Sequence, residues 1–458
     1  MKGVYREASS ENNIGSSNRK IFQYAVPVMF TLLLQLLSNA IDTILLGRFG
    51  SEKALATIGV ATPIINLFTN AFLAFSSGAS IAVAQSIGLG DKERISKASH
   101  TSVLLGVISG VIIAVSGTLL TEWTLIHSGC PMDIFDMAVD YMRYYYLTVP
   151  ATAVYYFCAA VFRANGDTGT PLKILLGSSI LHIAISWYEV VLKGDALLGV
   201  AFSTLISQSL SAIITLFLLC LKQNDCQIKL TKLIIDPYQF KRIVSVGLPA
   251  MVQSVCMTYS NVVIQSAINS FGTDVIAGAT AANSVLNILV NPASEGVVQA
   301  TAIFVSQAYG GKRYKEVKSI VMDAYAVGFI MTFVLGVATT VFGKPLLAIY
   351  TSDNAVVIDT GYVRVAVECL SYFLCAFQGS ICSAMRGIDY AVYPLISTVI
   401  GTSLFRWVWI KTIFALSPTL FVLYMCYPVS WLITFAYQHY VFERKMNVLL
   451  GDNNDQKV

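Results

Sequence analysis

The chain has 458 residues, of which 55% are hydrophobic and 12% are charged. Soluble domains usually carry about 25% charged residues, so this composition excludes an ordinary soluble protein. The net charge of +4 alone says little about binding partners. We expect the protein not to bind nucleic acid. The composition therefore predicts an all-α integral membrane protein that lies in a lipid bilayer.

Apolar runs of about 20 residues, the length that spans a bilayer as a helix, recur along the whole chain. We expect twelve transmembrane helices from them and no separate soluble domain. The runs cover residues 21–47, 57–87, 101–122, 141–162, 172–192, 196–221, 245–270, 275–308, 319–342, 362–384, 393–413 and 418–441.

Polar segments divide the chain into five parts. These are an N-terminal tail (1–20), a lobe of six helices (21–221), a linker (222–242), a second six-helix lobe (243–441) and a C-terminal tail (442–458). The first tail lacks the order of a signal peptide, so the first helix should remain in the mature protein. Lys and Arg gather in the tails, the linker and the even-numbered connections. The positive-inside rule then places both termini in the cytoplasm of a multi-pass plasma (inner) membrane protein.

Cysteine and histidine give no sign of catalysis or metal binding. The nine cysteines are scattered without a CxxC pair, as expected of small buried hydrophobic residues. Of four histidines, only His182 lies deep in a predicted helix. We therefore expect no enzyme activity, no metal site and no cofactor apart from a coupling ion, H⁺ or Na⁺.

The first predicted helix carries a polar stripe. Gln35, Ser38, Asn39 and Asp42 follow at i, i+3, i+4 and i+7, so they share one helical face. A carboxylate near the middle of a membrane helix costs about 2.5–3.5 kcal/mol, so Asp42 should face the protein or a water-filled cavity. The stripe is either a structural seam between helices or an ion or substrate site, and we favour the site.

The two halves of the chain repeat each other. A shift of 222 residues aligns Pro27 with Pro249 and Asn39 with Asn261. Because each half holds six helices, both halves keep the same orientation, related by an axis along the membrane normal with a binding cavity between them. This organisation indicates a transporter, which we expect to be monomeric. Further matches pair Gln85 with Gln307, Gly88 with Gly310 and, with a shift of 223, Arg163 with Arg386 and Pro171 with Pro394.

The sequence resembles the multidrug and toxic compound extrusion (MATE) family, particularly its DinF-type branch. The resemblance covers nearly the whole chain and depends on several motifs in order. In the first half these are NAIDTILLGRFG, AQSIGLGD, FRANGDTGTP and LLGVAFSTLISQ; in the second they are VGLPAMVQS, INSFG, FVSQAYGG, SLFRWVWI and YPVSWLIT. The resemblance implies an antiporter that exports organic, often cationic, compounds in exchange for Na⁺ or H⁺.

The family pattern of Gln, Asn and Asp in the first helix corresponds to Gln35, Asn39 and Asp42. Ser38 stands where the family commonly has Tyr, so one wall of the pocket is altered. We expect Asp42 to couple transport, since a buried carboxylate can hold a proton until an approaching cation competes for the same charge.

The fifth helix departs from the family pattern. The family usually carries Asn, Asn and Asp where this chain has Ser179, His182 and Ser186. The loss of these ligands favours H⁺ over Na⁺. His182 is either a structural hydrogen-bond donor or a titrating partner of Asp42. Glu189 shares the helical face, and we interpret it as a local charge near Lys193 rather than a transport residue.

The second half has no acid where Asp42 would repeat: Ile264 takes its place, followed by Gln265. The eighth helix instead carries a polar row at i+4 spacing, interrupted by Pro292. The row is either a structural ridge of hydrogen bonds or a site in which Glu295 recognises cations. Its members are Asn283, Asn287, Asn291 and Glu295.

Three arginines in or beside the spans need an explanation. Arg364 should form a local ion pair with Glu368 one turn away. Arg406 is expected either to neutralise a carboxylate or to pack on a neighbouring tryptophan. Arg163 marks the end of the fourth helix, where a conformational or folding role is favoured over substrate contact.

The leading hypothesis is a cation-coupled multidrug antiporter. A lipid-linked oligosaccharide flippase of the same superfamily and a non-transport membrane protein are the alternatives. The candidate coupling residues are Asp42, Asn39, His182 and Ser186. The candidate substrate-binding residues are Gln35, Ser38, Asn66, Ser179, Thr204, Asn261, Gln265, Asn283, Asn287 and Glu295.

Overall fold

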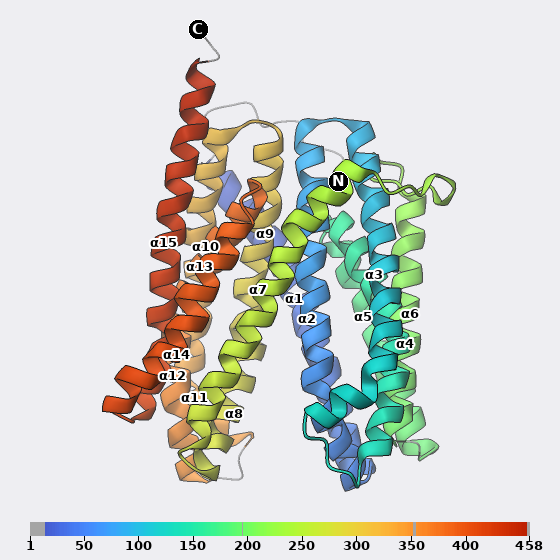
Figure 1. Cartoon of the computed structure of the whole chain (residues 1–458), viewed down its shortest axis with the longest axis vertical. Coiled ribbons are helices and arrows are strands. Elements are labelled where there is room, and N and C mark those ends of the chain that lie inside the picture. Colours follow the sequence, from blue (N-terminus) through green and yellow to red (C-terminus); the bar gives the residue numbers. More distant parts are fainter. Residues whose placement is uncertain (1–13, 195, 351–353, 456–458) are drawn as a thin grey trace.

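The computed structural model describes residues 14–194, 196–350 and 354–455. Every regular element in these ranges is helical, which confirms the all-α prediction. Figure 1 shows α1 beginning and α15 ending toward the same end of the molecule. We call this the terminal end.

The first lobe contains six helices that cross the molecule. The fifth continues α5 with one π-helical turn, η1. Their bounds are α1 (Ile14–Phe49), α2 (Glu52–Leu89), α3 (Lys92–His127), α4 (Phe135–Ala164), α5 (Gly169–Trp187), η1 (Tyr188–Leu192) and α6 (Ala196–Leu221).

The second lobe follows a connection that contains the short 3₁₀ turn η2 (Leu230–Lys232). Its last helix, α15, continues far into the segment predicted to be a tail from residue 442. The bounds are α7 (Pro237–Asn269), α8 (Thr273–Leu289), α9 (Asn291–Gly310), α10 (Tyr314–Val341), α11 (Gly343–Ala348), α12 (Ala355–Gly387), α13 (Val392–Thr398), η3 (Val399–Leu404), α14 (Phe405–Trp409), η4 (Ile410–Phe414) and α15 (Leu420–Asp455).

In the described part of the chain, twelve helical segments run from one end of the molecule to the other. Ten helices are long and apolar enough to span a membrane, and α8 with α9 forms an eleventh span bent by 43°. The twelfth is the run from α13 to η4, in which α and π turns alternate without a gap. The bend follows from Pro292, which has no N–H to donate to the preceding turn.

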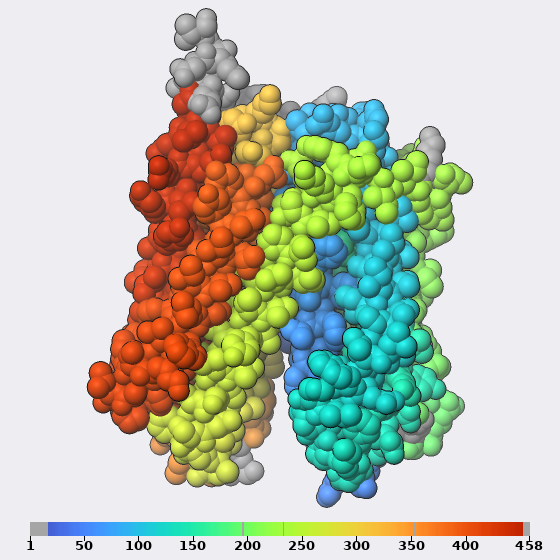
Figure 2. All heavy atoms as spheres, viewed as in Figure 1, coloured from blue at the N-terminus to red at the C-terminus, as the bar shows by residue number. Residues whose placement is uncertain are grey.

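The lobes pack on each other through α1, α2, α7 and α9. Helix α2 lies against both α7 and α9, and α1 lies against α9. Glycines allow these backbones to approach closely, because a Cβ on Gly78 would overlap the backbone of α7 and one on Gly296 would lie 2.6 Å from the Ala25 oxygen. Figure 2 shows the lobes touching near the terminal end and separating toward the opposite end.

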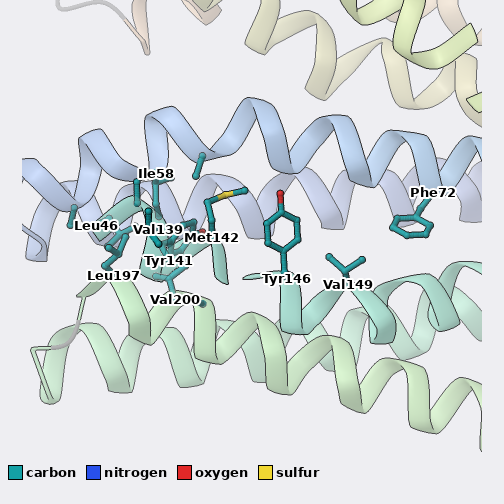
Figure 3. Packing of buried hydrophobic residues seen from close by; sticks show 14 of the residues in the cluster. Leu46, Ile58, Phe72, Val139, Tyr141, Met142, Tyr146, Val149, Leu197 and Val200 are labelled. Atoms are coloured by element: carbon teal, nitrogen blue, oxygen red, sulfur yellow. The ribbon is translucent and has the colours of Figure 1, made fainter. Parts of the chain in front are cut away.

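Each lobe has its own apolar core. In the first lobe, Leu46 of α1 and Ile58 of α2 meet Met142 and Tyr146 of α4, all buried (Figure 3). Leu197 of α6 closes the cluster on the far side. This packing fixes α1 against α4 and α6, and so fixes the direction in which its polar stripe faces.

Candidate functional site

A cavity of about 690 Å³ lies between the lobes. Helices α1, α2, α4, α5 and α6 line it on one side, and α7, α9, α12 and α13 on the other. Because the lobes separate away from the terminal end (Figure 2), the cavity is closed at the terminal end and open toward the opposite end.

All four residues of the predicted stripe on α1 line this cavity. The Gln35 amide donates to the Tyr156 hydroxyl at 3.3 Å, and Ser38 donates to Ser179 at 3.2 Å. The stripe therefore forms hydrogen bonds to α4 and α5 and also faces the cavity.

The carboxylate of Asp42 in the cavity wall contacts two side chains of α5. Nε2 of His182 lies 2.9 Å from Oδ1 and 3.0 Å from Oδ2 of the carboxylate. Ser186 donates to Oδ1 at 3.3 Å. The side chains are mostly buried, at 14% exposure for Asp42 and 6% for His182. The predicted coupling residues of α1 and α5 thus form one cluster, in which Asn39 lines the cavity next to Asp42.

The hydroxyls of α6 support this cluster from behind. Ser203 lies 2.6 Å from Ser186, and Ser207 lies 3.5 Å from Nδ1 of His182. Nδ1 of His182 thus faces a hydroxyl and Nε2 faces the carboxylate, so a proton on Nε2 is donated to Asp42. No sequence signal had singled out Ser203 or Ser207.

The remaining first-lobe candidates also line the cavity: Asn66 from α2, Ser179 from α5 and Thr204 from α6. Ser186 does not line it and acts only from behind Asp42. Tyr141 and Tyr145, from the aromatic run at the start of α4, form part of the same wall.

The polar row of the second lobe is split by the bend. Asn291 and Glu295 line the cavity, whereas Asn283 and Asn287 lie outside it. Asn283 accepts a hydrogen bond from Arg364 at 3.2 Å, which places it within the lobe. The structure therefore does not unite the row into one site, because Asn283 and Asn287 belong to α8 and Glu295 belongs to α9.

Of the two candidate substrate-binding residues on α7, one lines the cavity and the other does not. Asn261 lines the cavity and accepts a hydrogen bond from Arg406 at 3.2 Å. Gln265, one turn later, donates to Asn269 and lies outside the cavity. Helix α7 thus contributes Asn261 and not Gln265.

The contacts of Arg364, Glu189 and Arg406 test the local roles predicted for them. The ion pairs Arg364–Glu368 and Lys193–Glu189 both form, each at 2.7 Å, as expected. Neither expectation for Arg406 is confirmed, since among the described residues it forms no ion pair and its cation–π partner is Tyr427 rather than a tryptophan. Its guanidinium lies 4.3 Å from the Tyr427 ring and donates to Ser430 and Asn261, which are available because α15 and α7 flank α14.

The closed end is held by a symmetric pair of hydrogen bonds across the lobes. The Gln85 amide donates to the Gly387 oxygen at 2.8 Å, and the repeat-related Gln307 donates to the Ala164 oxygen at 2.9 Å. Gln85 also donates to Asp389, which pairs with Arg242 at 3.1 Å. These contacts join α2 to the end of α12 and α9 to the end of α4.

Two arginines at the closed end were not predicted as site residues. Arg163 and Arg386, which occupy equivalent positions in the two repeats, both line the cavity. Their equivalence in the repeat was a signal that could have identified them.

Among the described residues, no group of three or more His, Cys, Asp or Glu side chains is arranged to hold a metal ion. The nine cysteines are all free thiols.

Comparison with known proteins agrees with this architecture. The MatE family matches residues 27–188 and 249–409, one match in each lobe. The chain is 23% identical over 448 residues to the probable multidrug resistance protein YoeA of Bacillus subtilis, which covers 93% of this chain and 94% of that protein. It is 22% identical over 404 residues to the probable multidrug resistance protein NorM of Thermotoga maritima, covering 87% and 86%.

A solved structure has the same fold. The outward-facing conformation of a multidrug resistance MATE family transporter of the MOP superfamily superposes with a TM-score of 0.88 at 20% identity, covering 95% of this chain and 97% of that chain. A bundle of twelve helices in two repeats around a central cavity defines a membrane transporter rather than an enzyme. The chain belongs to the MatE family.

Proposed function

We propose that this protein is a secondary antiporter that exports drugs or other organic compounds, with cations prominent among them, in exchange for H⁺. The contact between His182 and Asp42 in the cavity wall carries the proposal. The multidrug resistance names of the relatives support the substrate class.

Proton and cation compete through the charge of this pair. When His182 carries a second proton beyond the one on neutral imidazole, it forms with the Asp42 carboxylate an ion pair of no net charge. When that proton leaves, a net charge of −1 faces the cavity. Two unit charges about 4 Å apart attract by about 4 kcal/mol at an effective dielectric constant of about 20, so a bound cation favours proton release.

The loss of Na⁺ ligands in α5 supports H⁺ as the coupling ion. An imidazole and two hydroxyls stand where the resembling family carries two amides and a carboxylate. A hard cation such as Na⁺ is better served by carboxylate and carbonyl oxygens, whereas imidazole exchanges protons near neutral pH. The driving force is sufficient, since one charge crossing about 100 mV gains about 2.3 kcal/mol.

The excess of Lys and Arg in the tails and even-numbered connections supports a terminal end that faces the cytoplasm. The cavity then opens to the outside, which is the state that releases substrate and accepts a proton. Asn261 and Glu295 contribute polar groups from the second lobe, and Glu295 assists cation recognition.

The substitution Asp42→Asn tests the proposal. Export of ethidium from cells should fall at least about tenfold at matched expression, because the amide cannot alternate between the two charge states. The control is Asp140→Asn, which removes an exposed carboxylate of α4 outside the cavity and should leave export unchanged. Export by Asp42→Asn near the wild-type rate would refute the mechanism.

A further inference from the structure

Arg163 brings a positive charge to the cavity, and the described residues place no ion-pair partner beside it. The residue is 8% exposed, stands in the last turn of α4 and lines the cavity. Its backbone oxygen accepts a hydrogen bond from Tyr24. Among the residues that the structure describes, its guanidinium takes part in no hydrogen bond or ion pair within 4 Å.

This charge is permanent, because an arginine keeps its proton at neutral pH. An anion in the cavity can accept hydrogen bonds from its free N–H groups. Asp42 is not available for this, because it is bound to His182 and stands about 27 Å of helix rise beyond Tyr24.

Arg386 provides a second cationic group from the other lobe. Its guanidinium donates to the side-chain oxygen of Gln253, whose amide nitrogen donates to Thr398 at 2.8 Å. This arrangement holds the uncharged oxygen of Gln253 toward Arg386. The Nε atom of Arg386 is buried and has no partner among the described residues.

Of the two carboxylates that line the cavity, Asp42 is bound to His182 and Glu295 belongs to α9. Glu295 acts electrostatically on Arg386, and its neighbour Gly296 packs on Ala25, beside Tyr24. It forms no ion pair with either arginine within 4 Å in the described part of the chain. Among the residues that line the cavity, the charges of Arg163, Arg386 and Glu295 sum to +1.

We propose that Arg163 and Arg386 form an oxyanion subsite at the closed end of the cavity. The substrates of this transporter then include organic compounds that carry a carboxylate or phosphate group, with a cationic group directed toward Glu295 where they have one. Guanidinium groups bind such oxyanions with paired hydrogen bonds. This proposal rests on the proposed function because it names a further substrate class for the same cavity.

The test compares two dyes that differ in one group. Rhodamine B carries a cationic xanthene and a free carboxylate, and its ethyl ester keeps the cation but lacks the carboxylate. Equilibrium binding to the purified full-length protein is measured without any ion gradient. Arg163→Gln and Arg386→Gln should each weaken rhodamine B about tenfold or more and change binding of the ester less than about twofold.

Two controls keep the outcome interpretable. Lys173→Gln removes an exposed positive charge outside the cavity lining and should leave binding of both dyes unchanged. Inorganic phosphate added to the wild type should displace rhodamine B and leave the ester bound, a result that needs no variant to fold.

Equal losses for both dyes in the arginine variants, no loss for either, or a wild type from which phosphate displaces neither dye would overturn the subsite. Because no gradient is present, a failure of H⁺ coupling would leave the binding difference intact. The failure of this inference and that of the antiport proposal are therefore distinguishable.

Discussion

The carboxylate of Asp42 is held by two groups that differ in what they can do with a proton. The Ser186 hydroxyl can only share a hydrogen bond, whereas the His182 imidazole can carry the proton itself. Nε2 lies at nearly the same distance from both carboxylate oxygens, so it can donate to either one. We expect the pair to change its charge within one arrangement of α1 and α5.

The substitution His182→Gln separates the hydrogen bond from the titration. Binding of the permanent cation tetraphenylphosphonium to the wild type should rise between about pH 6 and 8, because the pair loses a proton and becomes negative. The glutamine still donates to Asp42 but does not titrate, so the variant should show little pH dependence over this range. His439→Gln, whose ring contacts Tyr325 away from the cavity, should retain the wild-type profile. A wild-type profile in His182→Gln would contradict the role of the pair.

Glu295 offers a test of cation recognition in the second lobe. Glu295→Gln should weaken rhodamine B ethyl ester by about 1–3 kcal/mol, the range for a charge-assisted contact, and spare the neutral dye Nile red. Glu122→Gln removes an exposed acid paired with Arg143 and should change neither. An equal loss of both dyes in Glu295→Gln would show that the residue is structural. Equilibrium binding of the two dyes to each purified variant measures the difference.

At the scale of the helices, closure depends on the contact between α2 and α9. A Cβ on Gly88 would overlap the backbone of Gln307, and a Cβ on the repeat-related Gly310 would overlap that of Gln85. The two helices therefore touch at their ends only because both positions are glycine. The same ends carry the glutamines that bind the opposite lobe.

The substitution Gly88→Ala should weaken this closure. Overpacking costs about 1–3 kcal/mol, so the closed end should open more often and export should slow. Hydrogen exchange of the backbone amides in residues 85–90 and 305–311 should become faster. Gly59→Ala on the same helix is the matched control, since nothing lies within 4 Å of its Cβ. Unchanged exchange in Gly88→Ala would show that this contact does not hold the end closed.

The sequence predicted the helices better than their interruptions. Each predicted apolar run corresponds to one helical segment that spans the molecule, because length and hydropathy decide whether a segment inserts into a bilayer. The break after Leu289 was not located, although Pro292 indicated a weak point. As a result, four polar residues at i+4 spacing were expected to form one row, whereas the bend directs Asn283 to Arg364 and Glu295 to the cavity.

At the scale of the whole molecule, the repeat predicted two lobes with a cavity between them. The resemblance to the MATE family, rather than the repeat, brought the α1 stripe and the α5 substitutions into one hypothesis, in which His182 is a partner of Asp42. The repeat did not reveal that Arg163 and Arg386 line the cavity. Both lie in the last turns of long helices, and periodicity alone cannot distinguish a helix end that faces water from one that faces the other lobe.

The central claim is that substrate and protons move in opposite directions through this protein alone. The most direct measurement is proton flux in proteoliposomes that contain only this protein, with a pH-sensitive dye inside. The buffer holds potassium and valinomycin in place of Na⁺, so that no membrane potential forms. An imposed ethidium gradient should then drive protons the other way, and Asp42→Asn should abolish that flux. Ethidium transport that persists after the proton gradient is collapsed, but requires a Na⁺ gradient, would contradict the account.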